Sequence, residues 1–440
     1  MSTKTKKYPN VDPSLDSVDV GSIRRGIFFH FDANELLATL LLVVSTNLLS
    51  LESPLEAFSP GRSAGVSLLF SCGAIILSFA FLKRLRNYPG VGQLHYVLPV
   101  FLASYGTAIA AILILRLNYS IFVLILSLVM TVLAQGCFLL ARDRLIPKVK
   151  YFIVEGGRTA DIVLPSAIEV LRPDKPAIPE DPNVAIVADL HYDHSAQWLR
   201  VFAQAALRGV PVYHVTEVIE TITGRVQIDH LSENHFGSLL VIGAYSAAKR
   251  IVDIIVAVVL LLLLAPLFFV VACSIRLQSK GPVFFRQMRV GFRGKIFEVI
   301  KFRTMYTQDA SADDRATAMT SQDDDRITAV GHFLRRSRID ELPQLINVLR
   351  GEMSLIGPRP EALALSRWYL SEIPFYEYRH IVRPGITGWA QVNQGHVTDL
   401  TDVREKLHYD FFYIKNFSYW LDFLILIRTV NTIFTGFGAK

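Results

Sequence analysis

The sequence predicts a membrane α-helical bundle of four transmembrane helices, then a small Rossmann-like α/β domain, then an α+β domain that starts with a re-entrant membrane helix. Two observations predict this class. Hydrophobic residues make up 51% of the 440 residues and charged residues only 19%, which is too apolar for an ordinary soluble protein. Long apolar runs fill the first third of the chain, and short strand-like runs precede one further long apolar run. The expected boundaries are 1–33, 34–145, 150–236 and 246–440, with the re-entrant helix at 249–277.

The four apolar stretches of the first third each have the roughly 20 residues needed to cross a bilayer. They cover residues 34–51, 64–82, 96–115 and 121–140. Lysines and arginines concentrate before the first stretch, between the second and third, and after the fourth, whereas the alternate loops hold only Arg62 and Arg116. By the positive-inside rule, we expect the N-terminus and everything after Arg142 in the cytoplasm. The first apolar run starts too late for a cleaved signal peptide.

Residues 150–236 differ in texture and predict a small α/β domain. Apolar runs at 151–154, 183–189 and 209–215 predict short buried strands, and an amphipathic pattern at 195–207 predicts a helix between them. The segment EGGR follows the first strand and is compatible with a phosphate-binding loop. A plain turn is favoured because no GxGxxG is present, and we assign no cofactor to this domain.

The apolar run at 251–273 is long enough to span a membrane, but Pro266 in its second half favours a kink. Basic residues flank the run on both sides: Lys249 and Arg250 before it, Arg276 and Lys280 after it. Both ends therefore carry the charge typical of the cytoplasmic side. A broken helix that enters and leaves by the same membrane face explains this better than a fifth crossing.

Basic residues in the last domain predict phosphate binding. KIFEVIKFRTM predicts a strand on which Lys301 and Arg303 point to the same face, although a solvated basic face explains this strand equally well. GPRP holds Arg359 between two prolines, which stiffens the loop and directs a guanidinium fork that matches phosphate oxygens. Arg383 repeats this pattern before Pro384. Exposed arginines in ordinary turns are the alternative for each Arg-Pro pair taken singly.

Glycines near the second Arg-Pro pair, Gly385 and Gly388, allow backbone to approach a ligand closely.

Two adjacent acids, Asp340 and Glu341, precede a helical pattern that Gly351 is expected to end. Pro343 fits only a first helical turn, so both acids are expected at the helix N-terminus. Asp340 taken alone is explained as a helix cap. The helix N-terminus and the nearby Arg335, Arg336 and Arg338 should keep both carboxylates ionised. An ionised pair can attack phosphorus or hold Mg²⁺ against a phosphate, so these segments together predict phosphoryl transfer.

Four long motifs stand in order in the last domain: GPVFFRQMRVGFRGKIFEVIKFRTM, DDRITAVGHFLRRSRIDELPQLINVLRGEMSLIGPRPE, RPGITGWAQVNQG and LHYDFFYIKNFSYWLD. Through these motifs residues 250–423 resemble the catalytic domain of the bacterial sugar transferases, the polyprenyl-phosphate hexose-1-phosphate (phosphoglycosyl) transferases. The preceding helices and α/β domain also look like those of large members, more weakly before residue 240. A Ser-Pro break of some members is Ala265-Pro266 here, so any role of that hydroxyl is absent.

The resemblance implies a covalent mechanism. Asp340 would attack the β-phosphate of a UDP-sugar, UMP would leave, and undecaprenyl phosphate would attack the phosphosugar-aspartate intermediate. Glu341 would bind the cofactor Mg²⁺, Arg359 would hold phosphate, and Asp410 would be a further acid near the site, with a solvated helix acid as an equal alternative. The candidate phosphate-binding residues are Lys301, Arg303, Arg338, Arg359 and Arg383.

The implied protein is a multi-pass enzyme of the bacterial inner membrane that primes exopolysaccharide, capsule or O-antigen assembly from the cytoplasmic face. Its expected partners are a UDP-sugar, undecaprenyl phosphate and membrane lipid; we expect no nucleic acid and leave a homo-oligomer open. Glucose and galactose are both open as the sugar, and N-acetylated sugars are less favoured. Two alternatives remain: a membrane scaffold that binds anionic lipid through its net charge of +6, and a transferase that uses a ternary complex.

Other polar residues attract no functional assignment. Cys72, Cys137 and Cys273 lie in apolar runs and predict neither disulfides nor a metal site. A mobile acidic loop is favoured over a metal site for 307–326. The C-terminal pattern at 419–434 predicts a helix on the membrane surface or, nearly as well, a core helix. Four histidines without ligand spacing are expected to be structural: His332, His380, His396 and His408.

Overall fold

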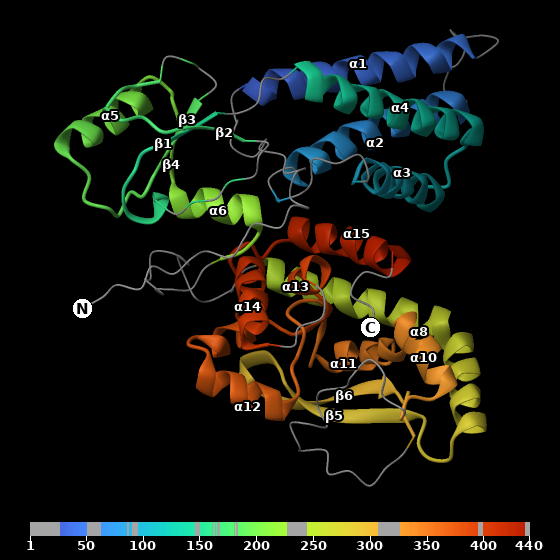
Figure 1. Cartoon of the computed structure of the whole chain (residues 1–440). Coiled ribbons are helices and arrows are strands. Elements are labelled where there is room, and N and C mark those ends of the chain that lie inside the picture. Colours follow the sequence, from blue (N-terminus) through green and yellow to red (C-terminus); the bar gives the residue numbers. More distant parts are fainter. Residues whose placement is uncertain are drawn as a thin grey trace. The chain divides into compact units, whose positions relative to one another are not determined.

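The computed structural model divides the chain into two compact units, Met1–Gly224 and Arg225–Lys440, which are described separately. Figure 1 shows the elements of each unit. The structure describes residues 27–50, 63–85, 88–89, 96–145, 244–306, 326–394 and 399–435, and 150–226 with short gaps at 161, 163, 165–167, 180 and 182–183. The acidic segment 307–325 and His396 lie outside these residues. Residues 227–243, which include most of the predicted boundary at 236–246, also lie outside them, and that boundary stays a prediction.

The first unit begins with four apolar helices, in agreement with the four predicted stretches. They are α1 (Ile27–Leu49), α2 (Ser63–Leu85), α3 (Val97–Ile114) and α4 (Ile121–Leu145). Among the described residues, four helices are long and apolar enough to cross a membrane: α2, α3, most of α4 and Tyr245–Gln278 of the second unit. The described part of α1, Asn34–Leu49, is apolar but shorter.

The bundle of α1 to α4 buries polar side chains among its apolar ones and exposes apolar side chains. Asn47 of α1 donates to Ser127 Oγ of α4 at 3.0 Å, and the hydroxyls of Tyr105 and Thr131 lie 3.2 Å apart. Leu69, in contrast, is 70% exposed. Hydrogen bonds between helices with leucine facing outward are typical of helices packed in lipid.

A four-stranded parallel sheet follows, with strand order β2-β1-β3-β4. Its elements are β1 (Lys150–Ile153), β2 (Glu169–Leu171), β3 (Val184–Ala188), β4 (Val212–His214), the short η5 (Gly157–Thr159), α5 (Ala196–Leu207) and α6 (Val215–Thr223). The three predicted strands and the predicted helix are confirmed. The sequence analysis missed β2, which has only three residues, all of them exposed.

The second unit is built on a long helix, an antiparallel hairpin and a set of short helices (Figure 1). The first elements are α8 (Ala244–Gln278), β5 (Phe284–Val290), η6 (Phe292–Gly294), β6 (Ile296–Phe302), α10 (Ala329–Arg336), η7 (Ile339–Glu341) and α11 (Gln344–Arg350). The others are β7 (Ser354–Ile356), α12 (Leu363–Glu372), η8 (Tyr376–Ile381), β8 (Gly385–Thr387), α13 (Trp389–Asn393), α14 (Leu400–Lys415) and α15 (Tyr419–Thr435). Strands β7 and β8 pair in parallel.

Helix α8 carries Pro266 inside it, and Figure 1 shows the helix turning sharply partway along its length. Ala257 in its first half packs with Phe297 and Val299 of β6. Its second half packs at the other end of the same strand, where Val271 and Ile275 contact Phe302. Both halves therefore rest on one hairpin. Apolar side chains between and beside these contacts stay open, and Leu262, Leu263 and Phe269 are each more than 70% exposed.

Helix α15 is a core helix, the second of the two alternatives for the C-terminal pattern. Leu421, Leu424 and Ile425 are fully buried, and the helix packs on α13, β7 and β8. Asp422 near its start pairs with Lys249 of α8 at 2.5 Å. These contacts tie the C-terminal helix to the long helix that begins the unit.

Candidate active site

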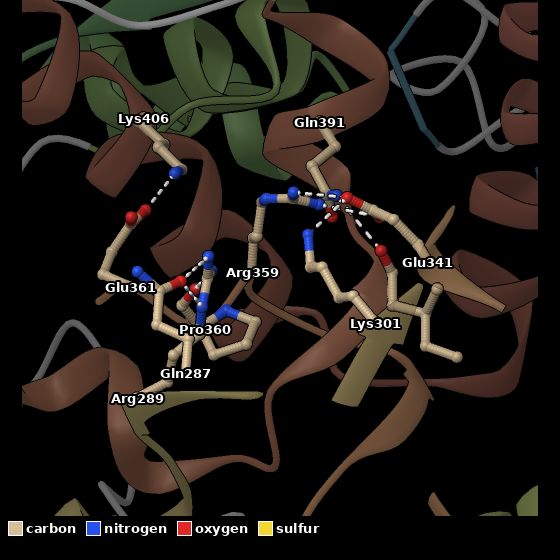
Figure 2. A network of polar contacts seen from close by, with 10 residues as sticks. Gln287, Arg289, Lys301, Glu341, Arg359, Pro360, Glu361, Gln391 and Lys406 are labelled. Atoms are coloured by element: carbon tan, nitrogen blue, oxygen red, sulfur yellow. Dashed lines mark hydrogen bonds and ion pairs between the residues drawn. The ribbon is translucent and has the colours of Figure 1, made fainter. Parts of the chain in front are cut away.

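The centre of the candidate site is the carboxylate of Glu341, which two cations hold. Arg359 donates to it through both terminal nitrogens, at 2.6 Å to Oε1 and 3.1 Å to Oε2, and Lys301 Nζ donates to Oε1 at 2.9 Å. Figure 2 shows Lys301, from β6, and Arg359, from the loop after β7, converging on Glu341. The structure therefore brings together three of the residues predicted from the sequence.

Burial and charge act in opposite directions on this cluster. Burial alone would raise the pKa of Glu341, but the charges of Arg359 and Lys301 outweigh it and hold that pKa well below its usual range. Burial lowers the pKa of Lys301 to about 8, with Arg359 contributing to the shift and Glu341 opposing it. Glu341 therefore stays ionised, and Arg359 and Lys301 neutralise its charge.

Asp340, the neighbouring acid, lies in the opposite environment. Its Oδ1 is buried and has no hydrogen-bond partner. Burial raises the pKa of Asp340, the charge of Glu341 adds to the shift, and Lys301 and Arg359 oppose it. The prediction that both acids favour the ionised form holds for Glu341, whose pKa is lowered. The pKa of Asp340 is raised instead, because burial disfavours its ionised form, and the sequence does not show this burial. The alternative role as a helix cap is wrong, since Pro343 occupies the N-cap position of α11 without a side-chain bond.

Local structure explains how the acid pair reaches β6. Arg338 adopts φ 57° in the left-handed region, which non-glycine residues rarely occupy, and the short turn η7 with both acids follows it. Asn347 of α11 then donates to Glu298 O at 2.6 Å and accepts from Ile300 N at 3.1 Å. These bonds fix α11 against β6, and the nearer of them is at Ile300, directly before Lys301. Gly351, with φ 84°, ends the helix as predicted.

The loop that carries Arg359 is held by two further arginines. Arg379 donates to Arg359 O at 2.8 Å, and Arg289 donates to Pro360 O (Figure 2). Lys406 and Arg379 pair with Glu361 and, against the effect of burial, lower its pKa to about 2. The loop is therefore fixed by charged bonds to its own backbone and not by its prolines alone.

Asp410 lies behind this loop and does not touch the acid pair. It is 1% exposed on α14, and Arg379 contacts its Oδ2 at 2.8 Å. Burial raises its pKa and Arg379 opposes the shift. The alternative of a solvated helix acid is wrong. The catalytic role predicted for Asp410 stays a prediction; in this geometry its carboxylate contacts Arg379, which in turn donates to the Arg359 carbonyl.

Two predicted phosphate ligands are bonded elsewhere. Arg303, just after β6, is 6% exposed and donates to Ser279 O at 2.9 Å and Lys280 O at 3.1 Å. Arg383 donates to Gly351 O at 3.2 Å, at the C-terminus of α11. Both guanidinium groups therefore support the ends of helices. Arg338 is half-buried at the turn before the acids, and the sequence-based assignment of phosphate binding to it stays a prediction.

The glycines of the second Arg-Pro segment serve backbone packing, contrary to the prediction of a ligand. A Cβ on Gly385 would lie 2.1 Å from Gly357 N, and one on Gly388 would lie 2.2 Å from Gly357 O. The backbones at β7 and β8, which pair in parallel, can approach this closely only because glycine has no Cβ. The space that the absent side chains leave is filled by the chain itself.

The donor set around Glu341 does not fit a resident Mg²⁺ as it is arranged. Both oxygens of Glu341, the residue expected to bind the ion, already accept bonds from an ammonium and a guanidinium group. A divalent cation there would lie beside two positive charges, which repel it. Asp340 Oδ1, in contrast, is buried and has no hydrogen-bond partner.

Sequence reasoning missed Gln287, Arg289, Arg379 and Lys406. The signal for Arg289 was present, since FFRQMRV alternates like a strand and places Arg289 with Gln287, whose Oε1 accepts from it at 2.9 Å. No pattern announces Arg379, which becomes visible only when η8 and α14 meet. His380 beside it is neutral, because burial lowers its pKa to about 3.

A second polar cluster lies in the α/β unit, at the carboxyl ends of β3 and β4. Asp189 Oδ2 accepts from Arg158 N at 2.9 Å and His214 Nε2 lies 3.5 Å from Oδ1, whereas His191 Nδ1 lies 2.5 Å from His214 Nε2. Thr216 N donates to His214 Nδ1 at 3.0 Å, so Nε2 carries the ring proton of neutral His214 and has no lone pair for a metal. The side chains of this cluster bond one another and the nearby backbone, and the plain turn expected at EGGR stays a prediction.

The acid pair and its cations can perform phosphoryl transfer. A buried carboxylate oxygen without a partner has lost the hydration that would weaken it as a nucleophile. A bidentate arginine and a lysine beside it can take over the negative charge that develops on equatorial oxygens.

Comparison with known proteins gives one family and several relatives. The family model described as bacterial sugar transferase matches residues 244–436. UDP-N-acetylgalactosamine-undecaprenyl-phosphate N-acetylgalactosaminephosphotransferase of Aeromonas hydrophila is 44% identical over 370 residues, 83% of this chain and 86% of that protein. This length exceeds either unit alone.

Other relatives match a shorter region. UDP-glucose:undecaprenyl-phosphate glucose-1-phosphate transferase of Caulobacter vibrioides is 43% identical over 198 residues, 44% of this chain and 73% of that protein. The protein of the same name from Escherichia coli K12 is 44% identical over 200 residues, 45% of this chain and 42% of its own length.

Proposed function

The chain belongs to the bacterial sugar transferase family and is an enzyme, and from this premise we propose that it transfers hexose-1-phosphate from a UDP-sugar to undecaprenyl phosphate and releases UMP. This reaction would prime exopolysaccharide, capsule or O-antigen synthesis. The chain is a membrane protein, and we place it in the bacterial inner membrane with the second unit on the cytoplasmic side.

The unpartnered oxygen of Asp340 supports a covalent route. In the first step a carboxylate oxygen of Asp340 bonds to the β-phosphorus of the UDP-sugar, and the bond from that phosphorus to the bridging oxygen breaks. UMP leaves with the electron pair. In the second step an oxygen of undecaprenyl phosphate bonds to the same phosphorus, and the Asp340 carboxylate leaves.

Arg359 and Lys301 are the proposed phosphate ligands of both steps. In the described arrangement they pair with Glu341, which keeps two buried cations in place and oriented before substrate arrives. When a diphosphate binds, it can take over part of these bonds. Glu341 is then a positioning residue for the cations, and Arg379 with Asp410 positions the backbone of Arg359.

Mg²⁺ stays a proposal to which no step is assigned. When bound, the ion would neutralise diphosphate charge beside Glu341 and Asp340. Because Glu341 does not fit the ion as arranged, its partners would have to change first. Chelation followed by addition of Mg²⁺ tests the requirement directly.

The exposed apolar residues of α8 support the proposal of a re-entrant helix. Both halves of α8 pack on one hairpin, so a straight crossing would pull that hairpin into the membrane. A helix that enters and returns leaves the hairpin outside and Asp340 at headgroup depth, where a lipid phosphate meets a soluble nucleotide sugar. The Rossmann-like description of the α/β unit stays a proposal without a ligand.

The test is a panel of UDP-sugars with and without undecaprenyl phosphate, with UMP release as the readout. The panel needs UDP-N-acetylgalactosamine beside UDP-glucose and UDP-galactose, because the relative that matches over both units is named for N-acetylgalactosamine. We expect Asp340→Asn to abolish release, and mass spectrometry of trapped wild type to find a sugar-phosphate adduct on Asp340. Asp399→Asn is the matched control, since Asp399 is exposed and its side chain caps nothing.

Near-normal turnover by Asp340→Asn would refute the covalent route. A wild type that releases no UMP from any member of the panel would favour the scaffold alternative. Sequential in place of ping-pong kinetics would favour the ternary complex.

A further inference from the structure

Phe285 is an open aromatic side chain next to the proposed phosphate ligands. It lies on β5 directly opposite Lys301 of β6 and is 47% exposed. Side chains of directly opposed residues in an antiparallel pair share a face, with Cβ atoms about 4.5–5.5 Å apart. A large apolar ring therefore lies beside the side chain of Lys301, whose ammonium group binds Glu341, where a purely phosphate-binding surface would not need one.

Strand alternation separates Phe285 from its neighbours. Gln287 and Arg289 follow it on the same face and lead to the Arg359 loop, as Figure 2 shows for those two residues. Phe284 and Met288 point to the other face. Phe284 stacks on Phe302 with ring centroids 5.5 Å apart, whereas Met288 is 48% exposed and away from the site.

The hairpin end that carries Phe285 also lies at the second half of α8. Phe302, one residue beyond Lys301, packs against Phe268 of α8 with ring centroids 5.2 Å apart. The next residues of α8, Phe269 and Val270, are 72% and 59% exposed. Phe285 therefore lies at the end of the hairpin that packs on α8, paired with Lys301 on the strand face opposite to Phe302.

A lipid acceptor must bridge the same two places. Its phosphate has to reach Lys301 and Arg359, and its hydrocarbon has to reach the membrane beside α8. We propose that Phe285 binds the first isoprene units of the polyprenyl chain and so guides the acceptor phosphate to Asp340. This rests on the proposed function. An aromatic ring can also bind a nucleobase. We favour the lipid because Phe285 lies at the end of β5 that is near the apolar helix α8, and not at the polar end that carries Arg289.

The test measures KM for both substrates in the full-length protein, with Phe285→Ala, Phe285→Leu and Met288→Ala beside wild type. We expect Phe285→Ala to raise the KM for undecaprenyl phosphate about tenfold and to leave the KM for the UDP-sugar within twofold. Phe285→Leu keeps apolar contact and should restore most of the affinity. With a short, water-soluble prenyl phosphate, the difference between Phe285→Ala and wild type should nearly vanish. Met288→Ala should match wild type throughout.

A rise in the KM for the UDP-sugar without one for the lipid would assign the ring to the nucleobase and overturn the inference. An unchanged KM for undecaprenyl phosphate would overturn it too. Failure of the proposed function is a separate outcome, because wild type and Met288→Ala would then release no UMP in the same assay.

Discussion

Two aspartates, one in each unit, lie in opposite environments. Asp189 follows β3 and accepts backbone N–H bonds from Arg158 at 2.9 Å and His191 at 3.1 Å. Burial opposes these bonds, but they and His214 together lower its pKa. Asp340 follows a strained turn, keeps one buried oxygen without a partner, and has a raised pKa.

The two aspartates differ in the groups that neutralise their carboxylate charge. Asp189 is bonded by backbone that cannot leave, so it is a structural anion that fastens the Gly157 loop. Around Asp340 the cations are bonded to Glu341 instead, and its oxygen stays available. Nearby cations alone therefore do not distinguish a carboxylate that is available for reaction. The distinguishing feature is a second carboxylate, here Glu341, that already binds those cations.

The substitution Arg359→Lys is expected to have the largest effect and tests this comparison most directly. Lysine keeps the charge but loses the fork that binds Glu341 and, by proposal, phosphate. We expect kcat/KM to fall roughly 100- to 1000-fold, the range for loss of one transition-state donor. The matched control is Arg158→Lys in the α/β unit, because Arg158 reaches Asp189 through its backbone. Equal effects of the two substitutions would contradict the comparison.

The pH profile sharpens the role of Lys301. Because its pKa is about 8, the ammonium form is complete below that pH and is lost as pH rises through it. If phosphate binding needs the cation, activity should fall above pH 8 by about tenfold per pH unit. Lys301→Arg should keep its charge and shift the falling limb upward. A profile of wild type that stays flat to pH 10 would rule out this role.

Asp189→Asn should act on stability and not on turnover. We expect a loss of about 1–2 kcal/mol in the free energy of unfolding of the α/β unit, because charge-assisted bonds become neutral ones. Since the folded pKa of Asp189 is lowered, its stabilisation is present above the unfolded pKa and is lost as pH falls through the folded pKa. Thermal melts of wild type and variant should therefore converge in acid. A loss of turnover with an unchanged melt would contradict the structural role.

The smallest effect is expected when the first unit is removed. A fragment that starts near Ser246 keeps every residue of the candidate site and should retain transferase activity. A fragment from Arg225 should be the more stable, because Val226 N donates to His408 O at 3.0 Å and Arg225 pairs with Glu405. Measured UMP release by both fragments tests this. A folded, membrane-bound fragment without activity would show that the first unit takes part.

Local patterns predicted the elements well. Apolar runs placed α2, α3 and α4, and the helical spacing with Gly351 placed α11. Alternation correctly put Lys301 on a strand face, and the acid pair and Arg359 were found because their motifs are continuous in sequence.

The bonding partners of the side chains were not predictable from the sequence, because many of these partners are distant along the chain. Arg303 shares a strand pattern with Lys301, but the end of α8 supplies the carbonyls that bind it. Arg379 and Asp410 meet only through the packing of η8 on α14. The raised pKa of Asp340 follows mainly from its burial, to which the charge of Glu341 adds, and a linear pattern does not contain the burial.

The C-terminus of α11 is bound by Arg250 of α8, which donates to Val348 O at 2.6 Å and Leu349 O at 3.1 Å. The helix has seven residues and is therefore about 10 Å long, and Asp340 and Glu341 come just before its other end. Such a short helix leaves little room for movement between Arg250 and the proposed nucleophile. If α8 is embedded in the membrane as proposed, the acid pair should keep a constant distance from it when the bilayer thins or thickens.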